Sequence, residues 1–487
     1  MTTSIDTATP GVATEPTPQP TLDTLDEAHL ASQSRDTGEP SWMADRRQQA
    51  LSTWSGQSWP DRKKDEFWRN TPFARLVDVG RPLITGADHD GDHTVELAVG
   101  VVDHLDAPAA TVTIVDGDLL DVRVDQSWAD QGLVVVGLRD AAAGPWAGIV
   151  SEHLGSLTTT GHGSGADEDR TISANDAAWD AGVFVYVPAE LEVKAPIGIQ
   201  AHVTRPGVHQ PRILVKAEHH ATARVVLEHV GGDLGDVERT SRVKAPAVVN
   251  EVVEVIARDS AQVDVVSVNE HGDDVAYLAL QKAAVHRDAT VRHLSVTLGG
   301  ATVRIRPEAD LVGPGASAVY SGIYFTDEGQ HFDVQPYMRH LAGHTTSNVL
   351  YKGALQGDSR TVFRGNVFIH KDAKGSDTQE DNRNLILTKG ARADSTPFLE
   401  IECADITAGH GSATGQIDAR NLFYLQARGI ERADALRLIV LGFFNEVLDR
   451  IDMPVVAARA QAAIEGEIAM TDLDRVTVSE VAPNTPD

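Results

Sequence analysis

Short runs of β-branched and apolar residues alternate with polar residues through the centre of the chain, from about residue 95 to residue 415. Clear examples lie at residues 111–115, 182–187 and 212–216. A period of two is typical of strands that bury one face. Between about 180 and 415 no amphipathic helical pattern of twelve or more residues stands out. The alternation therefore predicts a mainly β core.

The strand pattern also repeats along the chain. Similar segments begin at Ala221, Ala261, Ala289 and Ala316, and the last two steps are 28 and 27 residues. Each segment follows a turn that contains Asp, His, Ser or Gly. Short strands repeated at such spacing indicate a solenoid, in which each coil buries its inward residues against the neighbouring coils. We expect a parallel β-helix over residues 95–415. The alternative is an antiparallel sandwich, which would be unusual at this length.

Helical patterns lie on both sides of the predicted solenoid. Residues 22–94 contain short helical segments and four of the seven tryptophans, which we expect to pack this region onto something larger. Residues 416–472 have helical spacing again and form a predicted C-terminal helical domain. The Thr- and Pro-rich residues 1–21 are expected to be a disordered tail, and residues 473–487 a flexible one.

The C-terminal helical domain divides into three predicted helices. Asp418 can cap a helix that runs to Arg428, and Gly429 is a natural stop. A second helix spans about 431–451, and Pro454 permits a third to about Met470. The second helix has a Phe443–Phe444 pair, which either packs on the end of the solenoid or docks a partner; the sequence leaves both open.

Composition narrows the classes of function. Lys and Arg number 42 against 71 Asp and Glu, a formal charge of −29, so nucleic acid and anionic membranes should repel the chain. The one cysteine, Cys403, excludes a disulfide framework and a metal site built only from this chain's cysteines. No apolar run is long enough to span a membrane, and no secretory signal stands at the N-terminus. We expect a cytoplasmic protein.

A glycine-rich segment at residues 408–415 stands out because His410 lies between two glycines. It lacks the Gly-Lys-Ser/Thr ending of a nucleotide-binding loop. The plain interpretation is a tight turn between solenoid and helix. The functional interpretation is an accessible imidazole.

Other candidate groups have plainer explanations. His340 and His344 have zinc-like spacing, but Gly343 argues against the helix that such a pair needs. His331 and Asp333 alternate on a possible strand and can face the same side. His219–His220 fits a solvent-exposed turn, and Cys403 a buried inert thiol. The acidic residues Asp264, Asp273, Asp274 and Asp310 do not by themselves identify a glycosidase pair.

Several short motifs occur in a fixed order in the C-terminal half. They are Tyr351–Leu355, Ser359–Gly365, Asp377–Leu385, Pro397–Ile401, Ala404–Asp405, His410–Gly411, Ala413–Gln416 and Leu422–Gly429. Together they closely resemble the SufB/SufD family of iron–sulfur cluster assembly proteins. The strong match covers about residues 340–450, and a weaker one covers Trp42–Met43, Phe67–Pro72 and the solenoid. Trp68–Pro72 and His410–Gly411 are similar to the SufD branch.

This resemblance implies a right-handed parallel β-helix flanked by helical regions. It also implies a non-catalytic scaffold that pairs with a SufB-like paralogue and docks the SufC ATPase, where the ATP chemistry would belong. His410 matches a family histidine implicated in cluster assembly, and imidazole suits iron. No cofactor would be stably bound, only a transient iron–sulfur cluster. The residues implied in SufC docking are Phe423, Tyr424, Arg428, Gly429, Phe443 and Phe444.

One departure from the family pattern matters. Many SufD chains have a cysteine two positions before that histidine, where this chain has Ala408. Cysteine ligands at the interface should therefore come mainly from the paralogue. Two rival interpretations are a SufB-type paralogue and a β-helix enzyme that acts on polysaccharides. Complex stoichiometry, cluster type and homodimerisation without the paralogue stay open.

Overall fold

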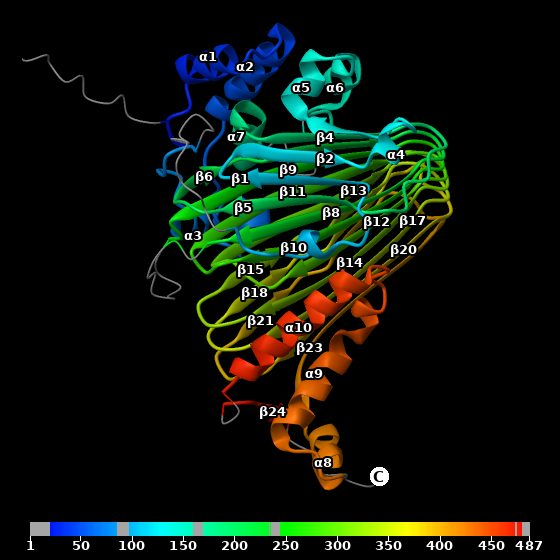
Figure 1. Ribbon diagram of the computed structural model, residues 1–487. Helices are drawn as coiled ribbons and strands as arrows, with labels where there is room; N and C mark the ends of the chain where they lie inside the picture. The colour runs from blue at the N-terminus through cyan, green and yellow to red at the C-terminus, as the bar shows by residue number, and fades with distance from the viewer. Residues whose placement is uncertain are drawn as a thin grey trace, which may run out of the picture.

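The computed structural model describes residues 20–84, 97–158, 169–232, 234, 244–472 and 475–479. Its centre is a parallel β-solenoid in which the chain passes alternately between two sheets (Figure 1). The ladders between successive coils are parallel, for example β10 with β12 and β11 with β13. The predicted mainly β solenoid is confirmed, and the antiparallel sandwich is excluded.

The first sheet holds one strand from each coil. In spatial order its strands are β2 (Asp118–Val124), β1 (Ala110–Val115), β5 (Ile197–Val203), β8 (Thr222–Gly231), β10 (Gln262–His271), β12 (Thr290–Thr297), β14 (Ser317–Thr326), β17 (Thr346–Leu355), β20 (Ser376–Ile386), β23 (Ile406–Asp418) and β24 (Val478–Ser479).

The second sheet faces the first across a narrow lumen. It runs through β3 (Val134–Gly137), β4 (Gly182–Val187), β7 (Arg212–Ala217), β9 (Ala247–Ala257), β11 (Val275–Val285) and β13 (Thr302–Leu311), with β6 (Gly207–His209) beside β9. Beyond β13 each coil contributes two short strands. These are β15 (His331–Val334) and β16 (Tyr337–His340), β18 (Arg360–Phe363) and β19 (Asn366–Ile369), then β21 (Arg392–Ser395) and β22 (Phe398–Ile401).

One residue at the same corner of successive coils adopts a left-handed backbone conformation. These residues have φ between 54° and 77° and are His220, Ser260, Asp288, Gly315, His344 and Gly375. Each stands directly before a buried small residue: Ala221, Ala261, Ala289, Ala316, Thr345 and Ser376. The strands that follow pair in exactly this alignment. The sequence repeat is therefore confirmed, and its variable turn residue is the left-handed corner, which favours Gly, Asn, Asp and His.

Tyrosine rings and glycines interlock in the lumen. Tyr351 of β17 lies in register with Gly322 of β14, and Tyr324 of β14 lies in register with Gly353 of β17. Both rings are fully buried. A methyl group on either glycine would overlap the ring beside it. The Tyr-Lys-Gly motif at residues 351–353 thus supplies one ring and one glycine to the packing between neighbouring coils.

The N-terminal helices pack on the second sheet (Figure 1). They are α1 (Glu27–Asp36), α2 (Ser41–Gly56) and α3 (Phe73–Leu76). Trp68 lies under the Arg304 guanidinium at 3.6 Å. The Thr71 hydroxyl donates to Asp333 at 2.6 Å and lies 3.0 Å from the His331 ring nitrogen. The predicted packing of the tryptophan region is confirmed, and His331 and Asp333 face the same side as expected.

Four short helices lie between the first strands, inside the range predicted as solenoid. They are α4 (Gln126–Ala129), α5 (Leu138–Ala143), α6 (Ala147–His153) and α7 (Arg170–Ala178). Helices of four to nine residues are too short to produce a clear amphipathic pattern. These helices interrupt the N-terminal part of the expected range 95–415, although β1 already pairs in parallel with β5.

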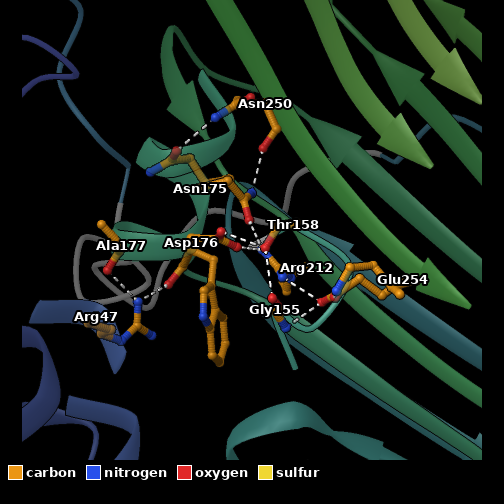
Figure 2. A network of polar contacts seen from close by, with 12 residues as sticks. Arg47, Gly155, Thr158, Asn175, Asp176, Ala177, Arg212, Asn250 and Glu254 are labelled. Carbon is orange, nitrogen blue, oxygen red and sulfur yellow. Dashed lines mark hydrogen bonds and ion pairs between the residues drawn. The ribbon is translucent and has the colours of Figure 1, made fainter. Parts of the chain in front are cut away.

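A buried ion-pair network fixes this helical insertion to the second sheet (Figure 2). Arg212 of β7 donates to Asp176 of α7 and, at 2.5 Å, to Glu254 of β9. The Glu254 carboxylate also accepts from the backbone N–H groups of Gly155 and Leu157. Each buried charge therefore has an opposite charge or a donor beside it, as burial requires.

The C-terminal helices follow the last coil. The helices α8 (Ala419–Ala427), α9 (Arg432–Leu448) and α10 (Pro454–Met470) agree with the three predicted, and the Asp418 side chain caps α8 as expected. In Figure 1, α9 and α10 lie along the outer face of the first sheet and α8 lies beyond its end. No helix in the described ranges is long and apolar enough to span a bilayer.

The predicted tails fall mostly outside the described residues. Residues 1–19 and 480–487 are not described, nor are residues 85–96 at the end of the N-terminal region. Thr21 forms a bridge with Pro82, and β24 pairs with the end of β23. The described parts of both tails therefore contact the folded chain.

Gly353→Ala should destabilise the protein by about 2–3 kcal/mol, because the added methyl group has to displace the Tyr324 ring in a closed lumen. Urea unfolding followed by circular dichroism measures the loss. Gly415→Ala on β23 is the matched control, since a methyl group there meets no atom within 4 Å. Equal effects of the two substitutions would contradict the interlocking.

Candidate functional site

The solenoid ends in a coil with one uncovered edge. Its last strand, β23, pairs with β20 over residues 406–416 and with β24 only at Ile417 and Asp418. No second described strand pairs with residues 406–416. Phe398 and Ile401 of β22, in the same coil, are large apolar residues with exposed side chains. An unpaired strand edge with apolar residues beside it is a ready template for another chain.

His410 lies on this edge strand and is exposed. Its backbone is in register with Glu380 of β20, so both residues belong to the row that faces the lumen in earlier coils. The segment 408–415 is therefore strand, which corrects the expected tight turn. A side chain on Gly409 or Gly411 would press on Gln379 or Asp381 of β20. The glycines around His410 thus relieve crowding between neighbouring strands and do not mark a turn.

Glu380 is the least satisfied polar side chain near this edge. It is only 1% exposed, and neither carboxyl oxygen has a hydrogen-bond partner. Burial raises the pKa of this carboxyl to about 8, with a smaller contribution from Asp381. The carboxyl points at Gly365 on the opposite wall, where any side chain would overlap it. Because Gly365 has an ordinary negative φ, its lack of a side chain serves the carboxyl and not the backbone.

An aromatic surface lies on α8, directly after the edge strand. Phe423 is 72% and Tyr424 58% exposed, and the Arg428 guanidinium lies 5.2 Å from the Tyr424 ring centre. Gly429, at φ 85°, ends the helix. Exposed aromatic and arginine side chains on one short helix are typical of binding surfaces. We call Phe423, Tyr424 and Arg428 the α8 surface.

The phenylalanine pair on α9 divides between two environments. Phe444 is fully buried in the apolar layer between α9 and the solenoid, together with Val440, Ile323 and Leu350. It therefore cannot contact a partner in this conformation, which corrects the expectation for this residue. Phe443 is half-buried, with the Lys352 ammonium 5.1 Å from its ring. The helical period predicted both residues as apolar contacts but not which face the solenoid covers.

His410 and the α8 surface are separate along one continuous segment. Eight residues of strand lead from His410 to Asp418, the cap of α8. At roughly 3.3 Å per residue this is about 26 Å. One partner of ordinary size could cover both, or two partners could bind side by side.

The remaining sequence candidates take structural roles. His340 is buried and hydrogen-bonds Thr345 and Ser347, whereas His344 is a corner residue, so the two do not form a zinc pair. Cys403 is buried in the core as expected, although it lies just after β22 and not within a strand. His219 and His220 lie exposed at a turn as predicted.

The acidic candidates for a glycosidase pair all have partners: Asp273 accepts from the Gln330 amide at 2.8 Å, and Asp274 accepts from the Leu234 backbone N–H. Asp264 pairs with Arg292 at 3.0 Å, and Asp310 is held by Arg339. Within the described ranges no group of three His, Cys, Asp or Glu side chains is arranged to hold a metal ion. A metal at His410 would thus need fewer ligands from this chain or additional ligands from a partner.

Sequence reasoning missed Glu380 and Gly365, although both lie in motifs that carry the family resemblance. Alternate residues of β20, from Ser376 to Asn384, are buried and polar. A polar alternation of this kind looks like an exposed face in the sequence. The sequence does contain one sign of a buried polar row. Both alternating faces of β20 are polar, which is unusual for a strand inside a solenoid.

Comparisons with known proteins identify a family for this chain. Residues 200–443 match the family model described as the SufBD core domain of the SUF system for FeS cluster assembly. An iron–sulfur cluster assembly SufBD family protein of Mycobacterium bovis is 39% identical over 366 residues, 70% of this chain and 88% of the relative. A Mycobacterium leprae protein of the same description is 37% identical over 421 residues, 84% and 91% of the two chains. The iron–sulfur cluster assembly protein SufD of Bacillus subtilis is 24% identical over 448 residues, 91% and 98%.

Glu380→Met should stabilise the protein by about 1–3 kcal/mol at pH 8, because it removes a buried carboxyl that has no partner. The pKa of about 8 in the folded state exceeds the ordinary 4.5, so the folded state binds this proton more tightly than the unfolded state. The contribution of Glu380 to stability should therefore fall as pH rises from about 4.5 to 8, and the gain from methionine should grow over the same range.

Urea titrations of both proteins at pH 5 and pH 8 measure this difference. Asp381→Asn, which removes a carboxylate from the outward side of the same strand, serves as the control. A gain from Glu380→Met that is the same at both pH values would contradict the assignment.

Proposed function

The chain belongs to the SufBD family of iron–sulfur cluster assembly proteins, and on that premise we propose that it is a SufD-type scaffold subunit. The proposal is that it pairs with a SufB-like paralogue, docks a SufC-like ATPase and has no catalytic activity of its own. Similarity to SufD of Bacillus subtilis over 91% of the chain supports the SufD type. So do the segments Trp68–Pro72 and His410–Gly411, which are similar to the SufD branch.

The observation that carries the pairing proposal is the open last coil. Its edge strand leaves one side unpaired over residues 406–416 among the described strands, and Phe398 and Ile401 lie exposed in the same coil. A paralogue with the same fold would present a similar open coil, and the two ends could continue one another. His410 would then lie at the junction, where a transient iron–sulfur cluster could take ligands from both chains.

The α8 surface supports the docking proposal. The Phe423 and Tyr424 rings are exposed and are not part of the apolar layer on the solenoid. Residues of α9 and α10 supply most of the helical side of that layer. A docked ATPase would act on β23 directly, since α8 continues from that strand through Asp418. Its ATP cycle could thereby switch the junction between two arrangements that hide or expose the cluster.

The two rival functions lack support of this kind. A polysaccharide-acting enzyme needs a pair of free carboxylates, but Asp264 and Asp310 are both held by arginines. A SufB-type subunit should offer accessible thiolates, and Cys403 is the one cysteine and is buried.

Charged substitutions should separate the two partner surfaces. Phe398→Asp with Ile401→Asp should reduce capture of the paralogue at least tenfold, and Phe423→Asp with Tyr424→Asp should do the same for the ATPase, because each buries a new charge without a partner. Tagging only this chain, co-expressing both partners and weighing the complex by native mass spectrometry measures both.

Leu120→Asp is the control, because Leu120 is 57% exposed on β2, the strand at the other end of the first sheet from β23 and β24. Its complex should be unchanged. Purification of the wild-type chain without either partner would overturn the scaffold proposal.

His410→Ala should lower cluster assembly by the complex while leaving the stability of the chain within about 0.5 kcal/mol, because the residue is exposed. Iron and sulfide counts after anaerobic reconstitution measure the loss. Ser412→Ala, two residues along the same face of β23, is the control. Normal cluster yield from the His410 variant would remove this residue from the mechanism.

A further inference from the structure

Glu380 is an anomaly that the proposed function does not explain. A fully buried carboxyl without any hydrogen bond is unfavourable, and buried polar groups in folded proteins are almost always paired. Space for it exists only because residue 365 on the opposite wall is glycine. The fold therefore tolerates an unfavourable group at a position where an apolar side chain of the same size would fit.

Its position relative to His410 suggests why it is there. The two residues are direct register partners on neighbouring strands, which lie about 4.8 Å apart. Side chains at paired positions on one face of a sheet are within reach of each other. Beyond His410 the described chain adds no further coil at this position, so the pair stands at the open end of the lumen.

We propose that Glu380 and His410 together bind a divalent first-row metal ion at the open end of the solenoid, ferrous iron in the cell. This rests on the proposed function, in which His410 contacts the metal of the nascent cluster. An imidazole nitrogen and a carboxylate oxygen suit ferrous iron. The carboxyl releases its proton to water as its oxygen bonds to the ion.

Movement of the carboxyl toward His410 breaks no polar contact, because neither oxygen has a hydrogen-bond partner in the lumen. Two ligands from one chain leave the other coordination positions to water or to a partner. The site is therefore incomplete in the single chain, which agrees with an ion that has to be passed on. The outward-facing Asp381 on the same strand is engaged by the Gln379 amide at 3.0 Å and does not belong to this row.

The test is anaerobic metal binding by the full-length chain, with Co²⁺ followed by its visible absorption and Fe²⁺ by calorimetry. Glu380→Gln and His410→Gln should each weaken binding at least tenfold, and the double variant should lose little more, because both remove the same site. Asp381→Asn should bind as the wild type does. Wild-type affinity in Glu380→Gln, or an equal loss in Asp381→Asn, overturns the proposal.

Gly365→Ala supplies an independent variant with the opposite expectation. Its methyl group excludes the carboxyl from its place in the lumen, while His410 stays its register partner on the neighbouring strand. A folded Gly365→Ala chain should bind Co²⁺ at least as tightly as the wild type. A chain that is folded by circular dichroism but has lost binding overturns the proposal.

Co-purification with the two partners separates this inference from the function on which it rests. If the wild type assembles but Glu380→Gln binds metal unchanged, the metal site is wrong and the scaffold function stands. If the variants show the expected loss of binding but the wild type captures no partner, the scaffold function is wrong and the metal site stands.

Discussion

The left-handed corner that precedes six successive strands of the first sheet, β8 to β20, is the constraint on which the rest of the solenoid depends. It places one small buried residue at the same point of each coil, and the ladder that follows is then in register over its whole length. A slip of one residue would turn the lumen row outward and bring tyrosine rings against side chains instead of Gly322 and Gly353. Register at the corner thus determines which residues meet inside.

The same stacking makes the end of the solenoid different from its middle. Each inner coil is covered on both sides, so its lumen residues are buried whatever their polarity. At β23 the stacking stops, and the row that would face the lumen becomes a surface with His410 on it. The chemistry of the molecule is therefore concentrated where the repeat ends, and α8 extends from the same strand. A binding site of this kind does not require a pocket, because the end of the repeat already exposes a row of residues that would otherwise face the lumen.

Much of this architecture could be predicted from the sequence, because repetition and alternation are local properties. Ala261, Ala289 and Ala316 could be aligned correctly without coordinates, and the three C-terminal helices follow from caps and helical spacing. The predictions that were wrong depended on packing between segments that are distant in the sequence. Whether Phe444 faces solvent or the solenoid depends on where α9 lies, and glycines around His410 look like a turn until the side chains of β20 are beside them. Glu380 was missed because a buried polar row and an exposed one have the same alternation.

The position of Glu380 also shows how stability and function oppose each other in this fold. Polar residues of the interior coils pair with one another at several positions: Tyr324 donates to Asn384, and Tyr277 to Glu251, within the lumen. A buried carboxyl without a hydrogen-bond partner destabilises the folded state at any level of such an interior. It lies one strand from the open edge, the one level at which a lumen side chain can still reach a group outside. Stability favours an apolar residue at that level, so the carboxyl there is better explained by binding than by folding.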